Sequence, residues 1–177
     1  ASDVYKRQLQ PSAETLMVAD AITSTSELAI VMLERLRQLS DGFQYTKDSD
    51  ETIRIDTPKD GALVQILKDH LGKQRIIIFA AYRASIDRCV DLCRLNGWHV
   101  IRVDGRGWKQ LGAVPARVDT FQDRSGYNLP VAFVAHPDSA GKGLTLTASE
   151  TIVFYSNTFR AESRWQGEDR IHRPGMR

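Results

Sequence analysis

The first third of the chain carries a helical pattern of apolar positions. Between Ser24 and Ser40 the apolar residues recur every three or four positions, which predicts a helix with one buried face, and Asp41-Gly42 ends it. The first residue of this helix, together with Glu27, fits a capping box. The polar segment Thr46–Glu51 predicts a loop, and Thr52–Asp56 predicts a short strand.

From residue 57 onward, short apolar runs alternate with helical segments. Thr57-Pro58 begins a helix, because threonine caps it and proline suits the first turn, and Gly72 ends it. Arg75–Ala80 is a continuous apolar run bounded by polar residues, which is typical of a strand buried on both faces. The later elements expected are a helix marked by Ile86, Val90, Leu92 and Cys93 and closed by Asn96-Gly97, strands at His99–Val103, Val131–Ala135 and Ile152–Tyr155, and a helix at about Pro115–Gln122.

This alternation predicts an α/β fold, with one parallel sheet covered by helices on both faces. The expected domains are a helical lead-in with a loop over residues 9–56 and one α/β lobe over residues 57–177. Residues 1–8 are expected to be a non-native leader, because DVYKRQ resembles the translation of a transposon-end adapter used in sequencing libraries. The natural sequence would then begin near Leu9.

The composition excludes some classes of protein but does not identify the function. The 177 residues include 42% hydrophobic and 26% charged positions, as in an ordinary globular domain, and the net charge of +2 is too small to mark a nucleic-acid binder. Any such binding must therefore come from local patches. No apolar run is long enough to span a membrane, and a cytoplasmic location is expected. Cys89 and Cys93 are expected to be buried and reduced, and no metal site is expected.

The final stretch, Arg164–Arg177, carries the most specific chemistry. Gln166, Arg170 and Arg173 would share one face of a helix, since residues three and four apart are neighbours. Two guanidiniums and an amide suit an oligophosphate, because each guanidinium offers a fixed fork of donors to phosphate oxygens. The alternative, from the residues alone, is an arginine-rich helix end that is simply exposed to solvent.

QGEDRIHRPG, residues 166–175, resembles the Q-x-x-D-R-x-H-R-x-G box that closes the second motor lobe of Swi/Snf-type superfamily 2 helicases. The resemblance extends from Leu33 to Gly175, and Met176 departs from it, where the family commonly has glutamine. It implies a RecA-like fold, that of the C-terminal lobe of P-loop NTPase helicases. It also implies that the two arginines, assisted by the glutamine, reach across a cleft to ATP with magnesium, held mainly by a first lobe.

Ligands of open α/β sheets bind beyond the carboxyl ends of the strands, which makes the loops there candidates for nucleic-acid contact. Tyr82 and Arg83 follow the first buried strand, in a segment that resembles the family's motif IV. The helix that they open offers free N–H groups to a phosphate. The alternative is a plain strand–helix turn capped by Ser85.

A second loop contains Arg106, in a segment that matches the family's R-x-D-G. Arg106 and Lys109, with Trp108 between them, are basic residues interleaved with an aromatic one, a composition that permits contact with a nucleic-acid backbone. The alternative is that the Asp-Gly pair only forms a tight turn.

HPDSAGKGLTLT, residues 136–147, resembles motif V, where the family usually has S-T-x-A-G-G-x-G-L-x-L-T. Gly141 and Gly143 remove side chains where backbone approaches a ligand, and the resemblance implies that this loop also senses the nucleotide. Ser139 and Lys142 are candidates for contact with nucleic-acid phosphates. The HPDS start departs from the family pattern and resembles phage-type members of the group.

The sequence contains neither G-x-x-x-x-G-K-[ST], the loop that cradles ATP phosphates, nor an acidic D-E-x-H box that holds magnesium. In the family both belong to the first lobe. The resemblance therefore implies the second motor lobe of an ATP-dependent DNA translocase or helicase, inactive alone, with a first lobe in cis, ATP with magnesium, and DNA as partners. A non-catalytic nucleic-acid-binding α/β module is the alternative, and a flavodoxin-like small-molecule binder would require the arginine box to be coincidental.

Overall fold

The computed structural model describes residues 11–25, 29–46, 51–123, 128–139 and 146–156. The chain divides into two compact units, Ala1–Ala62 and Leu63–Arg177. None of the helices within the described ranges is long and apolar enough to cross a membrane. The cytoplasmic location stays a prediction.

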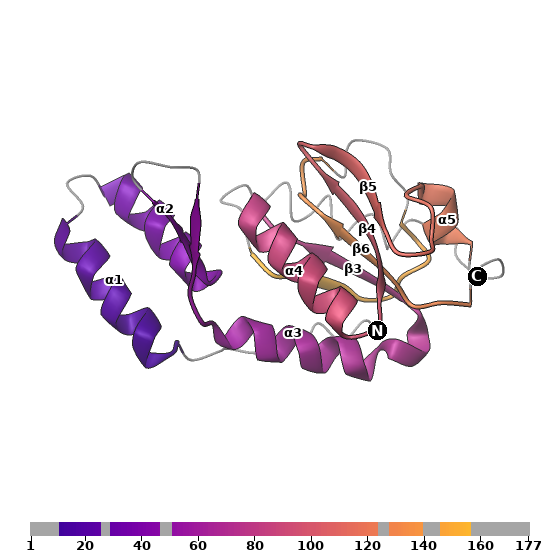
Figure 1. Ribbon diagram of the computed structural model, residues 1–177, viewed down its shortest axis with the longest axis horizontal. Helices are drawn as coiled ribbons and strands as arrows, with labels where there is room; N and C mark the ends of the chain where they lie inside the picture. The colour runs from indigo at the N-terminus through magenta and orange to yellow at the C-terminus, as the bar shows by residue number, and fades with distance from the viewer. Residues whose placement is uncertain (1–10, 26–28, 47–50, 124–127, 140–145, 157–177) are drawn as a thin grey trace. The chain divides into compact units, whose positions relative to one another are not determined.

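The first unit contains two helices and a short antiparallel hairpin (Figure 1). Its buried core is small and consists of Ile22, Leu39 and Ile55. Gly42 has φ 80°, the left-handed conformation that ends the second helix, as predicted from Asp41-Gly42. The elements are α1 (Ala13–Thr25), α2 (Ala29–Ser40), β1 (Phe43–Tyr45) and β2 (Thr52–Arg54).

The start of this unit differs from the sequence prediction. Ser24 lies inside α1, so the prediction that a helix begins at Ser24 is wrong. Glu27, the other residue of the predicted capping box, lies outside the described residues, and α2 is first described at Ala29. α1 and β1 escape the sequence analysis for a physical reason. α1 buries one apolar side chain, Ile22, and therefore shows no apolar stripe, while β1 is too short for a period-two pattern.

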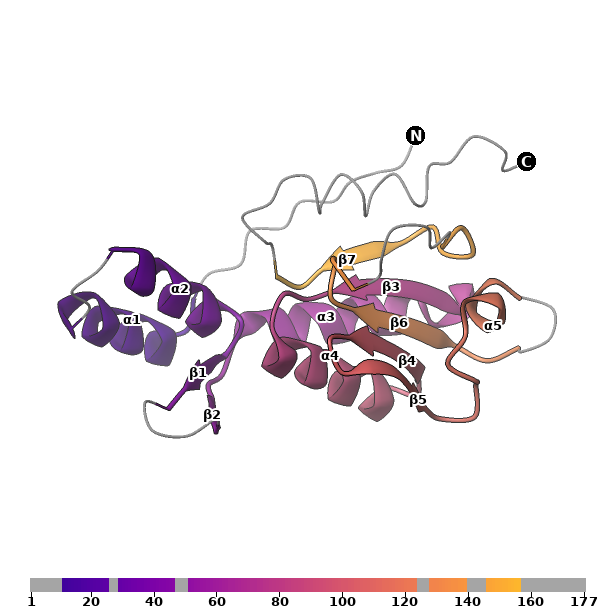
Figure 2. The ribbon, with the colours of Figure 1, turned by 90° about the horizontal axis from the view of Figure 1, so that it is seen from above.

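A five-stranded sheet forms the second unit, in the order β5-β4-β6-β3-β7 (Figure 2). Four strands are parallel, which confirms the prediction, whereas β5 runs antiparallel to β4 at the edge. The sequence analysis missed β5 because its residues, GWKQL, form no apolar run. The strands are β3 (Arg75–Phe79), β4 (His99–Asp104), β5 (Gly107–Leu111), β6 (Val131–Ala135) and β7 (Ile152–Phe154).

Helices pack on both faces of this sheet. On one face, Leu67 of α3 and Ile86 of α4 join alternate residues of the strands in one apolar core. On the other face, Phe121 of α5 packs against Phe133 of β6 with ring centroids 5.5 Å apart. These helices, α3 (Pro58–Asp69), α4 (Arg83–Leu95) and α5 (Val118–Gln122), are the three predicted after residue 57.

The predicted end of α3 is wrong, whereas the predicted burial of the two cysteines is confirmed. α3 ends at Asp69, and Gly72, the predicted stop, lies instead in the short 3-10 helix Leu71–Lys73. Cys89 and Cys93 form no disulfide and are buried, as predicted, and burial raises the pKa of the Cys93 thiol. The thiols are therefore part of the core of this unit.

A buried arginine fastens the amino-terminal edge of the sheet. Arg75, the first residue of β3, is 1% exposed. Its guanidinium donates to four backbone oxygens. One belongs to the residue just before β3, and the others lie on α5, on the segment that follows α5 and on the segment that enters β6. These acceptors are the oxygens of Phe121 at 2.9 Å and of Gln74, Asp123 and Leu129, each at 2.8 Å. A planar fork of donors satisfies all four at once.

We expect Arg75→Met to lower the free energy of unfolding by at least about 3 kcal/mol, because it leaves several buried carbonyls without a donor. Arg75→Lys should cost less, since lysine keeps the charge but not the fork. Urea denaturation followed by circular dichroism measures both. Arg94→Met, at an exposed residue in the last turn of α4, is the control and should change stability by less than about 1 kcal/mol. Equal effects of Arg75→Met and Arg94→Met would contradict this account of the edge.

Candidate functional site

The candidate site lies at the carboxyl edge of the four parallel strands. There the strand ladder continues one residue past the strand ends. Ala80 N–H, after β3, donates to Ala135 O of β6 at 3.1 Å. Tyr155 N–H, after β7, donates to Phe79 O at 2.9 Å. The loops that carry the predicted residues therefore leave from hydrogen-bonded strand ends.

The loop after β3 leads directly into α4. Tyr82 is the N-cap residue, with φ −116° and ψ 149°, and Arg83 is the first helical residue and exposed. Ser85 is fully buried in the first turn, so the alternative in which Ser85 caps the helix is wrong. The exposed guanidinium of Arg83 thus lies at a helix amino terminus, where the backbone N–H groups favour an anion.

A hydroxyl joins this loop to the end of β7. The Oγ of Ser156 accepts a hydrogen bond from the backbone N–H of Ala81 at 2.6 Å, and Ser156 is 6% exposed. The chain that leaves β7 toward the arginine box is therefore bonded to the loop that carries Tyr82 and Arg83. The sequence analysis did not single out Ser156, because an isolated serine after a strand carries no pattern.

Arg106 is held by two carboxylates. Its Nη1 and Nη2 donate to Asp87 of α4 at 2.9 and 2.7 Å. Its Nη2 also donates to Asp104 at 2.6 Å, and its backbone N–H donates to the same carboxylate at 2.8 Å. Arg102 lies 3.4 Å from Asp104 and is 9% exposed. These four residues, Arg102, Asp104, Arg106 and Asp87, form a charge cluster that joins the β4–β5 hairpin to α4.

Interactions within the cluster shift the pKa values of Asp104 and Arg106. Burial of Asp104 by itself would raise the pKa of its carboxyl group. The hydrogen bonds from the side chain and backbone of Arg106, with the charges of Arg106 and Arg102, outweigh burial and hold that pKa below its ordinary value. The hydrogen bonds from Arg106 to Asp87 and Asp104 raise the pKa of the Arg106 guanidinium. Asp104 and Arg106 are therefore both charged near neutral pH.

The turn after β6 brings Ser139 to the same edge. Ser139 N–H donates to His136 O at 3.1 Å, and Asp138 N–H donates to the His136 Nδ1 at 3.2 Å. That second bond assigns the ring proton of a neutral His136 to Nε2. Ser139 is half-buried and is the last described residue before the glycine-rich loop.

Beyond that loop, the chain is fastened again on the second face of the sheet. Leu146 is fully buried, and the side-chain oxygen of Gln122 accepts from Ala148 N–H at 2.7 Å. The sequence analysis assigned no role to Gln122, since nothing in the linear pattern connects the end of α5 with residue 148.

Several predicted residues fall outside the described part of the chain. These are Gly141, Lys142 and Gly143 of the glycine-rich loop, and Gln166, Arg170 and Arg173 of the arginine box. The structure thus brings Tyr82, Arg83, Arg106 and Ser139 to one edge of the sheet and leaves the roles of all the predicted site residues as predictions.

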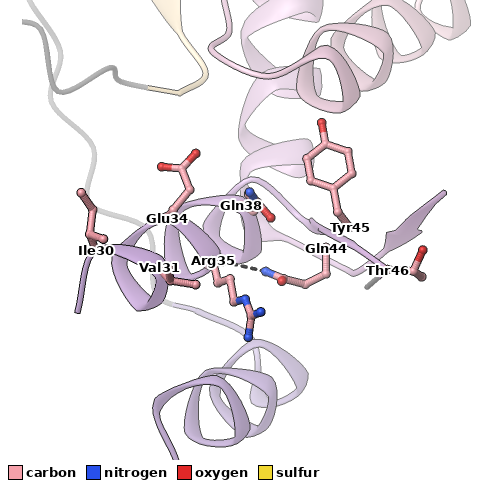
Figure 3. Close-up of a pocket in the computed structure, with 8 residues that line it drawn as sticks. All are labelled: Ile30, Val31, Glu34, Arg35, Gln38, Gln44, Tyr45 and Thr46. Atoms are coloured by element: carbon pink, nitrogen blue, oxygen red, sulfur yellow. Dashed lines mark hydrogen bonds between the residues drawn. The ribbon is translucent and has the colours of Figure 1, made fainter. Parts of the chain in front are cut away.

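Within the described residues, neither a metal site nor the cavity of the first unit indicates a second functional site. Within the described ranges, no group of three or more histidine, cysteine, aspartate or glutamate side chains is placed to hold a metal ion. A cavity of about 430 Å³ lies between α2 and β1, where the Gln44 amide donates to Arg35 O at 2.6 Å (Figure 3). Its lining includes none of the predicted site residues: Ile30, Val31, Glu34, Arg35, Gln38, Gln44, Tyr45 and Thr46.

The mixed sheet, its edge loops and the sequence boxes define the class of helicase C-terminal lobes. The model of the helicase conserved C-terminal domain matches residues 58–175, and the chain belongs to this family. Within the family it is a C-terminal lobe of the Swi/Snf type.

Sequence identity to two curated relatives supports this assignment. The chain is 32% identical over 119 residues to the SWI/SNF-related matrix-associated actin-dependent regulator of chromatin subfamily A-like protein 1 of Drosophila melanogaster, covering 67% of this chain and 15% of that protein. It is 26% identical over 172 residues to Helicase SWR1 of Candida glabrata, covering 92% of this chain and 11% of that protein. The chain thus matches a small fraction of each relative.

A solved structure shares the fold. The C-terminal part of the Fun30 ATPase domain superposes with a TM-score of 0.56 and 22% identity, covering 69% of this chain and 38% of that chain. The likeness confirms the predicted RecA-like fold, with β5 as an antiparallel addition to the parallel strands.

We expect Asp104→Asn to lower the free energy of unfolding at pH 7 by about 1–3 kcal/mol, because it removes a buried, charge-paired acceptor. The folded-state pKa of Asp104 lies below its unfolded-state pKa, so this stabilisation is present above the unfolded-state value and is lost as pH falls through the folded-state value. The stability difference between wild type and variant should therefore shrink below about pH 4.

Urea denaturation at pH 7 and pH 3 measures this difference. Asp119→Asn is the control, since Asp119 forms an exposed pair with Arg117 at 3.4 Å and should contribute about 0.5 kcal/mol or less. A stability difference for Asp104→Asn that stays constant from pH 7 to pH 3 would show that the charge of Asp104 does not stabilise the fold.

Proposed function

We propose that this chain is the second motor lobe of an ATP-dependent DNA translocase or helicase. The observation that carries the proposal is the family match over residues 58–175, a range of the sequence that includes both the glycine-rich loop and the arginine box. In the intact protein, ATP with magnesium would be held mainly by a first lobe in cis, because this sequence lacks the phosphate-cradling loop and the acidic box.

The chain would act on ATP through its arginine box. Arg170 and Arg173, assisted by Gln166, would stabilise charge on the transferring phosphoryl group, while Gly141 and Gly143 let backbone approach the nucleotide. An arginine finger accelerates hydrolysis by about 10³–10⁵-fold, or roughly 4–7 kcal/mol of barrier. The planar guanidinium suits this role because it offers two parallel donors to phosphate oxygens.

Contact with DNA would come from the carboxyl-edge loops. Arg83 is exposed at the amino terminus of α4, Tyr82 precedes it, and the Ser139 turn lies along the same edge, next to Lys142 in the sequence. Arg106 is a weaker candidate than the sequence suggests, because its guanidinium already donates to two carboxylates. DNA rather than RNA is favoured because one relative is a regulator of chromatin.

A non-catalytic nucleic-acid-binding module remains the second candidate, favoured by the absence of a phosphate-cradling loop from this sequence. It differs from the motor lobe in one measurable respect. In the module, the arginine box would bind the nucleic-acid backbone, and no first lobe would be needed.

We expect Arg170→Ala and Arg173→Ala, in a protein reconstructed with a first lobe, to reduce ATP hydrolysis by about 10³-fold or more with DNA affinity nearly unchanged. Arg170→Lys should also reduce ATP hydrolysis, since a point charge cannot replace the planar fork of donors. Steady-state ATPase rates, DNA affinity and melting temperature are measured together, and this chain without the first lobe should show no turnover. Loss of DNA affinity instead would favour the binding module, and turnover within tenfold of wild type in a folded variant would refute the arginine assignment.

We expect the chain alone to bind DNA weakly and with strong salt dependence, because phosphate contacts release counterions. On duplex DNA, log K should fall with log salt by about 0.9 per phosphate contact. Arg83→Ala and Lys142→Ala should each reduce that slope by about one contact in fluorescence anisotropy titrations. Arg94→Ala, at the far end of α4, is the matched control. Unchanged slopes in both variants would remove these residues from the interface.

A further inference from the structure

The β4–β5 hairpin exposes a tryptophan. Trp108 is 43% exposed, whereas Trp98, in the loop before β4, is 3% exposed. The neighbouring residues Gly107, Lys109 and Gln110 are also exposed. Large aromatic side chains are usually well buried, and an exposed one in a strand is a common feature of binding surfaces.

The indole packs on a buried ring, and the hairpin that carries it is fixed by ion pairs. Its ring lies edge-to-face on Phe133 of β6, with centroids 5.9 Å apart and planes at 71°. At the turn, Arg106 is bonded to both Asp104 and Asp87, which fixes the hairpin against α4. A ring that is already ordered loses little conformational entropy when it binds a ligand.

The strand register places this ring at the carboxyl edge. Trp108 pairs with Val103 of β4, and Val103 pairs with Ala135, the last residue of β6. The Ser139 turn follows β6 at that same edge. Trp108 therefore lies on the edge where DNA contact is proposed, with two strands, β4 and β6, between it and β3.

The two basic residues next to Trp108 differ in position and in partners. Lys109, the next residue on β5, is exposed, and within the described ranges it makes no ion pair. Because successive residues of a strand face opposite sides of the sheet, its side chain leaves β5 on the face opposite to Trp108. Arg106 is committed to carboxylates. What the hairpin offers to a nucleic acid is therefore the ordered aromatic face of Trp108, on which any base can stack.

We propose that Trp108 is a stacking platform for an unpaired nucleobase. The proposal rests on the nucleic-acid binding proposed above and adds the residue and the state of the ligand. An unpaired base is required, because in a duplex both faces of each base are covered by its neighbours. The interaction tolerates any base sequence, since every base presents a π-face.

The test compares binding of the full chain to a single-stranded oligonucleotide and to one of the same length carrying abasic residues, which keep the phosphates and remove the bases. Stacking is worth about 1–3 kcal/mol per base, so the abasic strand should bind about 5- to 150-fold more weakly. Trp108→Ala should abolish this difference, and Trp108→Phe should keep part of it. Leu95→Ala, at an 81% exposed apolar residue of α4, is the control and should leave the affinity difference between the two strands unchanged.

Further measurements separate stacking on Trp108 from other effects of the substitutions. Because the chain has three tryptophans, the quenching of Trp108 is the fluorescence change of wild type minus that of Trp108→Phe, and the single strand should quench it more than the duplex does. The salt slope should stay the same in Trp108→Ala, and melting temperatures verify that each variant is folded.

Each alternative result overturns the proposal in a distinguishable way. Equal binding of the intact and abasic strands by wild type would leave DNA binding in place and remove stacking. Failure to bind either strand would refute the proposed function together with this inference. A Trp108→Ala variant that changes oligomeric state but keeps the base-dependent preference would make the hairpin a protein–protein surface.

Discussion

The two-sided burial of the parallel strands is the constraint on which the rest of this lobe depends. β3 pairs with β6 on one side and β7 on the other, and all five of its residues are buried. A buried strand must satisfy every backbone group in its ladder, which keeps neighbouring strands in register. Because the strands are parallel, their carboxyl ends meet at one edge, and residues far apart in the sequence gather there.

Arginines at opposite edges of the sheet are paired differently. At the amino edge, the buried guanidinium of Arg75 donates to backbone oxygens and so holds α5 to the sheet. At the carboxyl edge, the guanidinium of Arg106 donates to two carboxylates, which fixes the hairpin and leaves less of its charge for a ligand. The same residue type therefore stabilises the structure in both places.

The chain matches only a small part of each relative. It covers 11% and 15% of the length of the two relatives described above. Within the described residues, the hydrogen bond from Ala81 N–H to the Ser156 Oγ joins the loop after β3 to the end of β7. Two of the loops at the carboxyl edge are therefore connected directly.

The sequence by itself determined the alternation of strands and helices from residue 57, because buried strands and amphipathic helices leave periodic apolar patterns. It also determined the family, through boxes whose spacing is specific. It missed β5 and α1, whose side chains are mostly exposed or unpatterned, and it misjudged Ser24 and Ser85, whose positions relative to helix ends depend on chain geometry. Tertiary structure alone decided the partners of Arg106, because Asp87 lies 19 residues away in sequence and meets it only when α4 packs on the sheet.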